Sequence, residues 1–542
     1  MGPAAEARGR HGTAPQGRHA RVARPRALAR GLRRTGPGRH RNDQGHRFAP
    51  EVRGVRGRER FRLGGPDGLL GLARGLGLRL PFSDDVGALL QPANVGPLAL
   101  PNRLAVHPLE GADAGPRGEP TELTRRRYVR FAAGGSGLLW FEAAAVSPEG
   151  RSNPRQLLLS RQNLDSWKRL TEDVRREAEA SLGRDHRTAL ILQLTHSGRF
   201  ARPDGTSKPV IARHHPLLDR LAGLEKDHPL VSDAELDRLA EAHAAAARLA
   251  AAAGFDGVDV KACHGYLIGE LLAARERPAS RYGGSYEDRT RWLKDTIRGI
   301  KAENPGLLVT SRLSAYDGPG APAGFGCLAS DEGRTEDLAE PIRLVQELAA
   351  AGVPLVSITV GIPALHPHIG RPFDVPVRGA ALPEEHPLTG VARHIAITGQ
   401  VQKAVPGLAL LGAGYSWLKE FAPPVAAGAL TEGSAALIGL GRGALAYPGW
   451  VRDLRDGGRL DPGRVCTACS RCSELLRRGG PAGCVIRDKK PYAAVYRDLC
   501  GPVRCAGRPA GRARRNPGGA DRRSRDRTAV SRNETGKEPD RH

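Results

Sequence analysis

Short apolar runs recur between residues 100 and 450, and each is followed by a stretch with helical hydrophobic spacing. A short continuous apolar run is typical of a strand buried on both faces, and the spacing after it predicts an amphipathic helix. There are eight such runs: RLAVHPL (103–109), GLLWFEAAAV (137–146), ALILQLTH (189–196), GFDGVDVKA (254–262), LLVTSRLS (307–314), PLVSITVG (354–361), LALLGAG (408–414) and AALIGLGR (435–442).

Eight alternations over roughly 350 residues predict an α/β fold of the (β/α)8 TIM-barrel type. The alternative is a doubly wound sheet, which the count and the absence of GxGxxG after the first strand disfavour. One helix start is marked by a capping box, in which Ser232 precedes a helical stretch and Glu235 follows three residues later.

Chemistry in a barrel lies at the carboxyl ends of the strands, and polar residues gather there in this chain. The fourth run ends in Lys261, His264 and Tyr266. The last two runs end in glycines, with Gly414 in GAG and Gly441 in GLGRG, each before a helical stretch. Such turns suit a phosphate, to which Arg442 would add charge, although a tight turn alone explains a glycine equally well.

The net charge of +25 is concentrated in the two ends of the chain. Residues 1–82 carry 19 Arg against 5 acids, residues 499–542 carry 12 basic residues against 5 acids, and the remainder is nearly neutral. Both ends are poor in apolar residues, so we expect disorder over 1–83 and 499–542. A misassigned start or reading frame explains them better than a nucleic-acid arm, because no aromatics interleave the arginines.

Four of the eight cysteines follow the spacing Cys466-x2-Cys469-x2-Cys472-x11-Cys484. Close CxxC spacing in a large chain favours a metal site over disulfides and a reducing, cytoplasmic compartment. Four thiolates are compatible with a [4Fe–4S] cluster or with zinc. The sequence shows no signal peptide and no apolar stretch long enough to span a membrane.

Several stretches together resemble the Old Yellow Enzyme family of FMN-dependent oxidoreductases. They are LLQPANVGPLALPNRLAVHPLEG, QLTHSGR (193–199), GFDGVDVKACHGYLIGELL, RYGGSYEDRTRWL (281–293), SRLS (311–314) and GLGRG. The match covers about residues 85–455 in order, and the cysteines resemble the iron–sulfur branch, which includes 2,4-dienoyl-CoA reductase and trimethylamine dehydrogenase. The resemblance implies an FMN-binding barrel over 84–455 and an iron–sulfur-binding extension over 456–498.

The resemblance also implies which residues would surround the flavin. Those placed along the ring are Pro108, Leu109, Glu110 and Ala143, those at its pyrimidine side are Gln193 and Arg312, and those at its phosphate are Gly414, Gly441 and Arg442. A cation beside the pyrimidine would stabilise the anionic reduced flavin. Arg312 could instead be structural, although an Arg at a strand end inside a barrel needs an anionic partner.

For the chemistry, the resemblance implies that Lys261 and His264 hold a substrate carbonyl and that Tyr266 donates a proton. Each has an ordinary alternative: His264 as a structural histidine, Tyr266 as a core tyrosine and Lys261 as an ion-pair partner. His366 and His368 follow the sixth run and could line the substrate pocket, but they could equally be solvated loop residues.

The sequence departs from the family at two of these positions. Lys261 stands where the family has His or Tyr, and its full charge should stabilise an enolate oxygen or suit a different, anionic substrate. Glu110 stands where the branch with covalent flavin has Cys, so FMN should be non-covalent. A carboxylate there must be protonated or paired, and Lys261 is a candidate partner.

The favoured function is reduction of the C=C bond of an α,β-unsaturated carbonyl compound. The electrons would come from NAD(P)H, or from a separate electron-donor protein through the cluster. The alternative is a dehydrogenase of an amine or alcohol that passes electrons out through the cluster. An inactive barrel with nucleic-acid-binding basic arms is a third hypothesis, which deletion of both ends would test through salt-sensitive binding.

Overall fold

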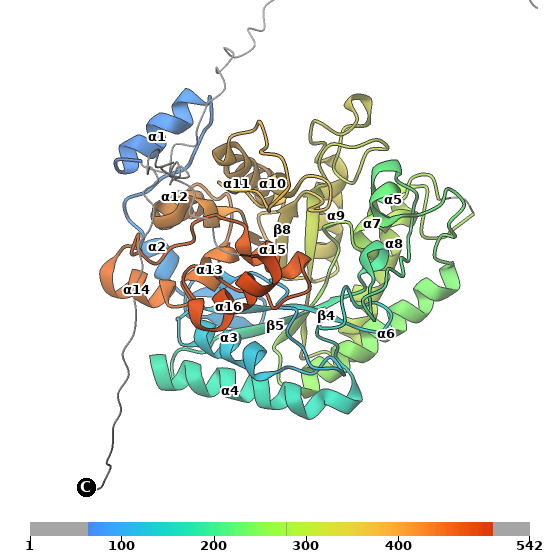
Figure 1. Ribbon diagram of the computed structural model, residues 1–542, viewed down its shortest axis with the longest axis horizontal. Coiled ribbons are helices and arrows are strands. Elements are labelled where there is room, and N and C mark those ends of the chain that lie inside the picture. The colour runs from blue at the N-terminus through green and yellow to red at the C-terminus, as the bar shows by residue number, and fades with distance from the viewer. Residues whose placement is uncertain (1–62, 278, 502–542) are drawn as a thin grey trace, which may run out of the picture. The chain divides into compact units, whose positions relative to one another are not determined.

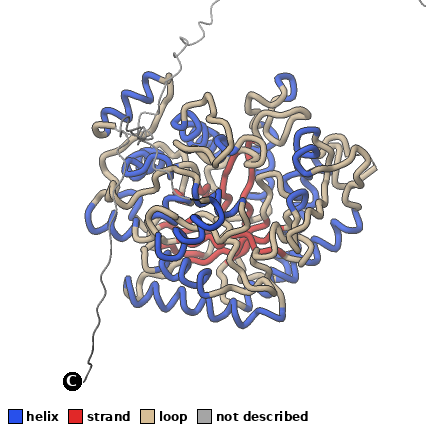
Figure 2. The backbone as a smooth tube through the Cα atoms, viewed as in Figure 1, coloured by secondary structure: helices blue, strands red, loops and turns tan. Residues whose placement is uncertain are grey.

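The computed structural model describes residues 63–277 and 279–501. Eight parallel strands form a closed barrel in the order β10-β3-β4-β5-β6-β7-β8-β9 (Figures 1 and 2). The predicted (β/α)8 fold is confirmed, and each of the eight apolar runs contains one barrel strand. The strands are β3 (Leu104–Val106), β4 (Leu138–Ala145), β5 (Ala189–Thr195), β6 (Gly257–Val260), β7 (Leu308–Tyr316), β8 (Leu355–Val360), β9 (Ala409–Gly412) and β10 (Leu437–Leu440).

Helices alternate with these strands and cover the outside of the barrel. The capping box predicted at the start of α6 is present, since the Ser232 side chain accepts from the Glu235 N–H. The longer helices of the barrel are α3 (Glu122–Ala132), α4 (Leu164–Leu182), α6 (Asp233–Ala252), α8 (Tyr286–Glu303), α9 (Ala339–Ala350), α11 (Pro387–Ala404), α12 (Ala422–Thr431) and α14 (Trp450–Gly457).

Shorter helical segments lie in the loops. They are α2 (Gly87–Leu90), α5 (Pro216–Ala222), α7 (Leu267–Leu272), α10 (Pro367–Gly370) and α13 (Arg442–Ala446), with the 3-10 turns η1 (Arg161–Asn163), η2 (Gly198–Phe200), η3 (Ala329–Asp331) and η4 (Tyr415–Phe421). Two of them, α7 and α13, directly follow strands that the sequence singled out for chemistry.

A hairpin that the sequence did not predict lies at the amino ends of the strands. It consists of β1 (Ala93–Val95) and β2 (Leu98–Leu100), which pair antiparallel. Val95 and Leu100 of the hairpin belong to one buried cluster with the first residues of several barrel strands, including Leu138 and Leu308. Apolar packing therefore fills this end of the barrel, and the opposite end is left for polar side chains.

The segment after residue 457 carries α15 (Arg471–Arg477) and α16 (Lys489–Cys500) and packs on the barrel (Figure 1). Asp488 accepts hydrogen bonds from Arg126 and Arg130 of α3. The Ala482 N–H donates to the Gly111 carbonyl at 2.6 Å, directly after β3. The extension is thus joined to the loop that leaves the first strand of the barrel.

Two expected boundaries need correction. The described residues include α1 (Pro66–Gly75), whose Leu69 is fully buried, so the expectation of disorder up to residue 83 is wrong for this stretch. Helix α16 also runs to Cys500, beyond the expected end of the extension at 498. The expectation of disorder for the remainder of both ends lies outside the described residues. Within residues 63–277 and 279–501, none of the helices has the length and apolar character needed to cross a membrane.

Candidate active site

The turn after β6 places three polar side chains at the carboxyl end of the barrel. His264 and Gly265 both have left-handed backbone conformations, with φ of +65° and +70°, and Tyr266 then precedes α7. A non-glycine residue in this conformation is uncommon and is often found at functional sites. The His264 Nε2 lies 3.3 Å from the Thr359 Oγ1, near the end of β8.

Glu110 joins two of these side chains. The Tyr266 hydroxyl donates to the Glu110 Oε1 at 2.7 Å, and the Ser152 hydroxyl donates to its Oε2 at 3.1 Å. The Lys261 Nζ lies 3.7 Å from the Glu110 Oε1 and 3.4 Å from the centroid of the Tyr266 ring. The pairing of Glu110 with Lys261 that the sequence suggested is confirmed. We refer to Glu110, Lys261, His264 and Tyr266 as the strand-end group.

Withdrawal from water shifts the pKa of Lys261, His264 and Tyr266 toward their neutral forms. Burial lowers the pKa of Lys261, and Glu110 opposes that shift. Burial, with Arg312 and Lys261 nearby, lowers the pKa of His264 well below its ordinary value. Burial and the Glu110 carboxylate raise the pKa of Tyr266 well above its ordinary value. At neutral pH the imidazole is therefore uncharged and the phenol keeps its proton.

Asp259 is a buried carboxylate that the sequence interpretation missed. It accepts hydrogen bonds from the Gln193 Nε2 at 2.6 Å, from the Trp140 Nε1 at 2.9 Å and from the Arg312 N–H at 2.6 Å. Burial raises its pKa to about 6. The sequence did contain an indication of this site, because Asp259 is an acid inside the apolar strand GVDV. A carboxylate buried in such a strand requires several hydrogen-bond donors. Because Gln193 donates one N–H to Asp259, its amide oxygen and its second N–H remain for a ligand.

Arg312 lies in β7, and its side chain reaches the segment after β3 that is expected along the flavin ring. Its Nη1 donates to the Pro108 carbonyl at 3.4 Å, and its buried Nε has no hydrogen-bond partner among the described residues. A buried N–H of this kind fits an acceptor that a ligand supplies. Ala143 lies in β4 beside an irregularity in the strand pairing, and its carbonyl accepts from the Gln156 side chain at 3.0 Å.

The ends of β9 and β10 carry the expected phosphate residues. Gly414 has φ of +98°, and a Cβ there would come within 2.8 Å of the His394 ring. Gly441 precedes α13, and a Cβ at this position would lie 3.5 Å from the Leu109 side chain. The Arg442 Nη2 donates to the Pro372 carbonyl, while its buried Nη1 has no partner within the described chain.

The four cysteines of the extension line one pocket together with Arg442. We call Cys466, Cys469, Cys472 and Cys484 the cysteine pocket. The Cys466 sulfur accepts the Ala468 N–H at 3.4 Å, and the Cys484 sulfur accepts the Arg487 N–H at 3.3 Å. All four thiols are free, and the described residues hold no group of three or more His, Cys, Asp or Glu side chains arranged around a single metal ion.

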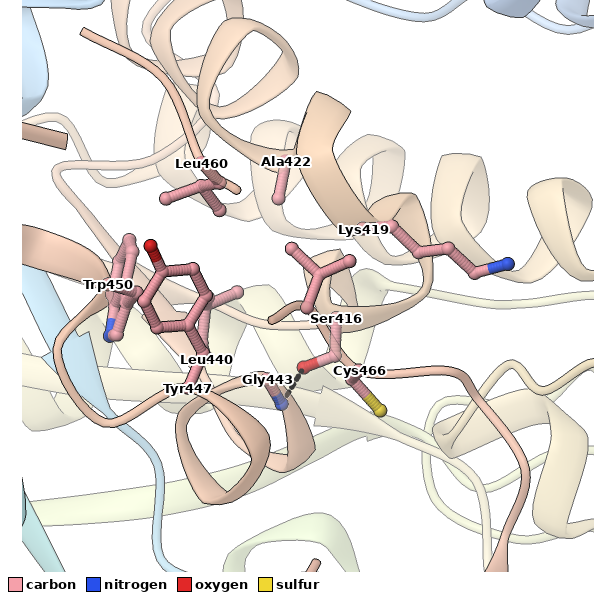
Figure 3. Close-up of a pocket in the computed structure, with 10 residues that line it drawn as sticks. Ser416, Lys419, Ala422, Leu440, Gly443, Tyr447, Trp450, Leu460 and Cys466 are labelled. Atoms are coloured by element: carbon pink, nitrogen blue, oxygen red, sulfur yellow. Dashed lines mark hydrogen bonds between the residues drawn. The ribbon is translucent and has the colours of Figure 1, made fainter. Parts of the chain in front are cut away.

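A second, smaller pocket adjoins the first one, and Cys466 lines both. Figure 3 shows its lining from η4, α13 and α14, with the Ser416 hydroxyl accepting the Gly443 N–H at 3.0 Å. Tyr447, Trp450 and Leu460 form its apolar side in the same view. The phosphate-binding candidates and the cysteines are therefore parts of one continuous region of the structure.

Comparison with known proteins agrees with this arrangement. The family model described as the NADH:flavin oxidoreductase / NADH oxidase family matches residues 88–325. An NADPH dehydrogenase of Bacillus subtilis (strain 168) is 30% identical over 278 residues, which cover 50% of this chain and 73% of that protein. The chain belongs to the NADH:flavin oxidoreductase / NADH oxidase family. The predicted membership of the Old Yellow Enzyme family is confirmed.

Other members of the family are longer than the matched region. An NADH oxidase of Thermoanaerobacter brockii is 26% identical over 388 residues, covering 70% of this chain, so the chain spans about half (52%) of that relative's length. A solved structure of a 2-naphthoyl-CoA reductase in complex with 2-naphthoyl-CoA shares the fold with a TM-score of 0.58 at 21% identity. That match covers 76% of this chain and 58% of the other.

Membership of the NADH:flavin oxidoreductase family implies FMN and NAD(P)H as cofactors. The residues present fit a flavin phosphate and an anionic ring, because Arg312 and Arg442 each leave a buried guanidinium N–H without a protein acceptor. At Gly414 a Cβ would collide with His394, so packing within the protein already requires a glycine there.

Proposed function

We propose that this protein is an FMN-dependent oxidoreductase that reduces the C=C bond of an α,β-unsaturated carbonyl compound with electrons from NAD(P)H. The observation that carries the proposal is the contact of Tyr266 and Lys261 with Glu110 beside the turn that holds His264. We propose Tyr266 as the proton donor and Lys261 and His264 as the side chains that bind the substrate carbonyl. Family membership supports the flavin and the nicotinamide donor.

When bound, the reduced flavin supplies a hydride to the β-carbon of the substrate. Non-covalent FMN would be held by Pro108, Leu109, Glu110, Ala143, Gln193, Arg312, Gly414, Gly441 and Arg442. Arg312 would stabilise negative charge on the ring, and Arg442 would take a phosphate oxygen with the Nη1 that the protein leaves unpaired.

In the reaction the protein would bind and protonate the substrate. Lys261 and the neutral His264 would donate hydrogen bonds to the carbonyl oxygen, which gains negative charge as the β-carbon receives the hydride. Tyr266 would then donate its proton to the α-carbon. The raised pKa of Tyr266 means that the phenol is fully protonated and available as an acid at neutral pH.

For the cysteine pocket, we propose a [4Fe–4S] cluster. The four thiols line one space, and N–H groups point at two of the sulfurs, as happens where a protein stabilises bound thiolates. Four thiolates also fit structural zinc, which is the alternative for this pocket. We assign the barrel to residues 84–455 and the cluster-binding extension to residues 456–500, the end of α16.

A second candidate function follows from the cysteine pocket. Because Arg442 lines that pocket and is also the candidate phosphate ligand, a cluster there would lie near the flavin. An amine or alcohol dehydrogenase that sends electrons out through the cluster to a separate protein would use the same layout. The two functions differ in the direction of hydride transfer.

The experiment is cofactor analysis of the purified protein with product analysis on the same sample. We expect FMN to be released by acid and iron to be present at about four per chain, as a [4Fe–4S] cluster requires. With NADPH or NADH, we expect 2-cyclohexenone to be converted to cyclohexanone. Oxidation of amines or alcohols without enone reduction would favour the dehydrogenase, and folded protein that binds no flavin would contradict both.

A further inference from the structure

Glu110 contacts the hydroxyls of Tyr266 and Ser152 at a partly exposed position of the active site. Its Oε1 holds the Tyr266 hydroxyl at 2.7 Å and its Oε2 holds the Ser152 hydroxyl at 3.1 Å. Ser152 in turn accepts from the Asn153 side chain at 3.0 Å, and both Ser152 and Asn153 are half-buried. The Glu110 side chain itself is 14% exposed. Glu110 is therefore a carboxyl group that contacts the Tyr266 hydroxyl directly and is also partly open to solvent.

The position of this carboxylate creates a requirement for Tyr266. If Tyr266 gave its proton to carbon while Glu110 stayed ionised, a phenolate and a carboxylate would lie 2.7 Å apart in a site withdrawn from water. Two like charges at that separation are strongly unfavourable. Tyr266 can therefore lose its proton easily only when another proton reaches its oxygen, and Glu110 is the acid in contact with that oxygen.

We propose that Glu110 is the proton-relay residue that reprotonates Tyr266, an inference that rests on the proposed function. As the hydride brings two electrons to the β-carbon, the O–H bond of Tyr266 breaks and a C–H bond forms at the α-carbon. The O–H bond of the Glu110 carboxyl breaks and the phenol O–H is restored. Glu110, now a carboxylate, takes its next proton from water on the Ser152 side.

Three groups face Glu110 and interact with its carboxylate. Lys261 lies 3.7 Å away and favours the carboxylate, while the Tyr266 hydroxyl donates to it. Glu142 is buried in β4, and its charge repels that of Glu110. A substrate carbonyl that engages the Lys261 ammonium would weaken the ion pair and so favour proton uptake by Glu110 at the moment when Tyr266 needs it.

The test compares wild type with Glu110→Gln, Glu110→Asp and Glu149→Gln as holoenzymes. Glu149 is an exposed carboxylate in the loop after β4, so its variant makes the same chemical change outside the site. Each protein is reduced anaerobically, mixed rapidly with 2-cyclohexenone, and followed by the return of the oxidised flavin spectrum over a range of pH. Reduction of the oxidised flavin by NADPH is measured separately.

We expect Glu110→Gln to slow reoxidation by on the order of 10²-fold and to abolish the fall in rate with rising pH that wild type shows. Glu110→Asp should keep that pH dependence, and Glu149→Gln should match wild type. Flavin reduction by NADPH should match wild type in Glu149→Gln, and Glu110→Gln should slow flavin reoxidation by the enone far more than it slows flavin reduction by NADPH. Equal rates and equal pH profiles in Glu110→Gln and Glu149→Gln would overturn the proposal.

A measurement without turnover separates the relay from the choice of substrate. In oxidised protein labelled with 3-fluorotyrosine, the resonance missing from Tyr266→Phe reports the contact with Glu110. The chemical shift of this resonance should change with pH in wild type and in Glu149→Gln but not in Glu110→Gln. A wild-type chemical shift that does not change with pH would overturn the proposal. If it titrates while 2-cyclohexenone reoxidises no flavin, the acid–base pair stands and the proposed substrate class fails.

Discussion

The strand-end group and the cysteine pocket differ in how their polar atoms are satisfied. In the strand-end group, Tyr266, Glu110 and Lys261 contact one another within 3.7 Å, so the chain itself holds them in place. In the cysteine pocket four free thiols face a buried guanidinium N–H of Arg442 that has no protein acceptor. The first region is organised before any ligand arrives, while the second has its charges offset only when an anionic group binds.

Arg371 provides a second guanidinium group beside the cysteine pocket. Its Nη1 donates to the Ser473 hydroxyl at 2.6 Å, in α15. Burial and the neighbouring Arg442 lower the pKa of Arg371 to about 9. Two guanidinium groups that destabilise each other's charge are favourable only beside an anion, and both a flavin phosphate and a thiolate-bound cluster are anions. The two regions thus differ in the partner of their charged groups, which is another side chain in the strand-end group and a bound anion in the cysteine pocket.

The largest expected effect is on the rate of flavin reoxidation, when the proposed proton donor of the strand-end group is removed. Tyr266→Phe removes the acid and leaves the ring, so reoxidation of reduced flavin by 2-cyclohexenone should slow by about 10²- to 10⁴-fold. Flavin content should be unchanged, since Tyr266 is not among the residues proposed to hold FMN. Rapid-mixing absorbance measures the rate, and a rate within threefold of wild type would remove Tyr266 from the mechanism.

The next effect breaks the cysteine pocket. Cys469→Ser removes one proposed ligand, and iron content should fall at least about tenfold, because loss even of a supporting contact weakens metal sites by that much. Cys500→Ser is the matched control, since that thiol lies in α16 outside the four-cysteine spacing. Iron analysis and the visible spectrum measure the result. Equal iron in both variants would contradict a cluster held by Cys469.

The third prediction tests whether a bound anion uses Arg442. Arg442→Ala should weaken FMN binding by about 2 kcal/mol, or roughly 30-fold, the usual size of a charged hydrogen bond. Arg184→Ala makes the same change at a side chain that is 91% exposed and should not affect binding. Fluorescence titration of flavin-free protein with FMN measures the dissociation constants. Equal constants in the two variants would show that the phosphate lies elsewhere.

The smallest effect is a dependence of the free energy of unfolding on pH. The histidines that cause it lie in the barrel, because residues 456–501 contain none. Burial lowers the pKa of His107 to about 3 and those of His196, His243 and His394 to about 4. The native state then binds fewer protons than the unfolded state below pH 6.5, so these histidines reduce stability as the pH falls.

Two buried carboxyls act in the opposite direction. Burial raises the pKa of Glu142 to about 7 and that of Asp259 to about 6, so protonation stabilises their native forms as the pH falls. Four histidines outweigh two carboxyls, and the free energy of unfolding should fall by about 1 kcal/mol between pH 7 and pH 6. Denaturant titrations at both values measure this. His243→Gln should reduce the dependence while His228→Gln should not, and stability that rises on acidification would contradict the assignment.

The barrel was predictable because its strands are buried on both faces and appear as continuous apolar runs. Lys261, His264 and Tyr266 were identified because they follow one such run directly in the sequence. The hairpin over Ala93–Leu100 was missed, since three-residue strands leave too short a pattern to detect. The contact of Tyr266 with Glu110 joins residues 156 positions apart, and no local pattern encodes which side chains of different strands meet.

The most direct test of the central claim is an anaerobic titration of the wild-type holoenzyme, first with NADPH and then with 2-cyclohexenone, followed in the visible spectrum. The account predicts that NADPH bleaches the flavin absorbance and that one equivalent of enone per flavin restores it with formation of cyclohexanone. Flavin that NADPH reduces but that no α,β-unsaturated carbonyl compound reoxidises would contradict the proposed reaction.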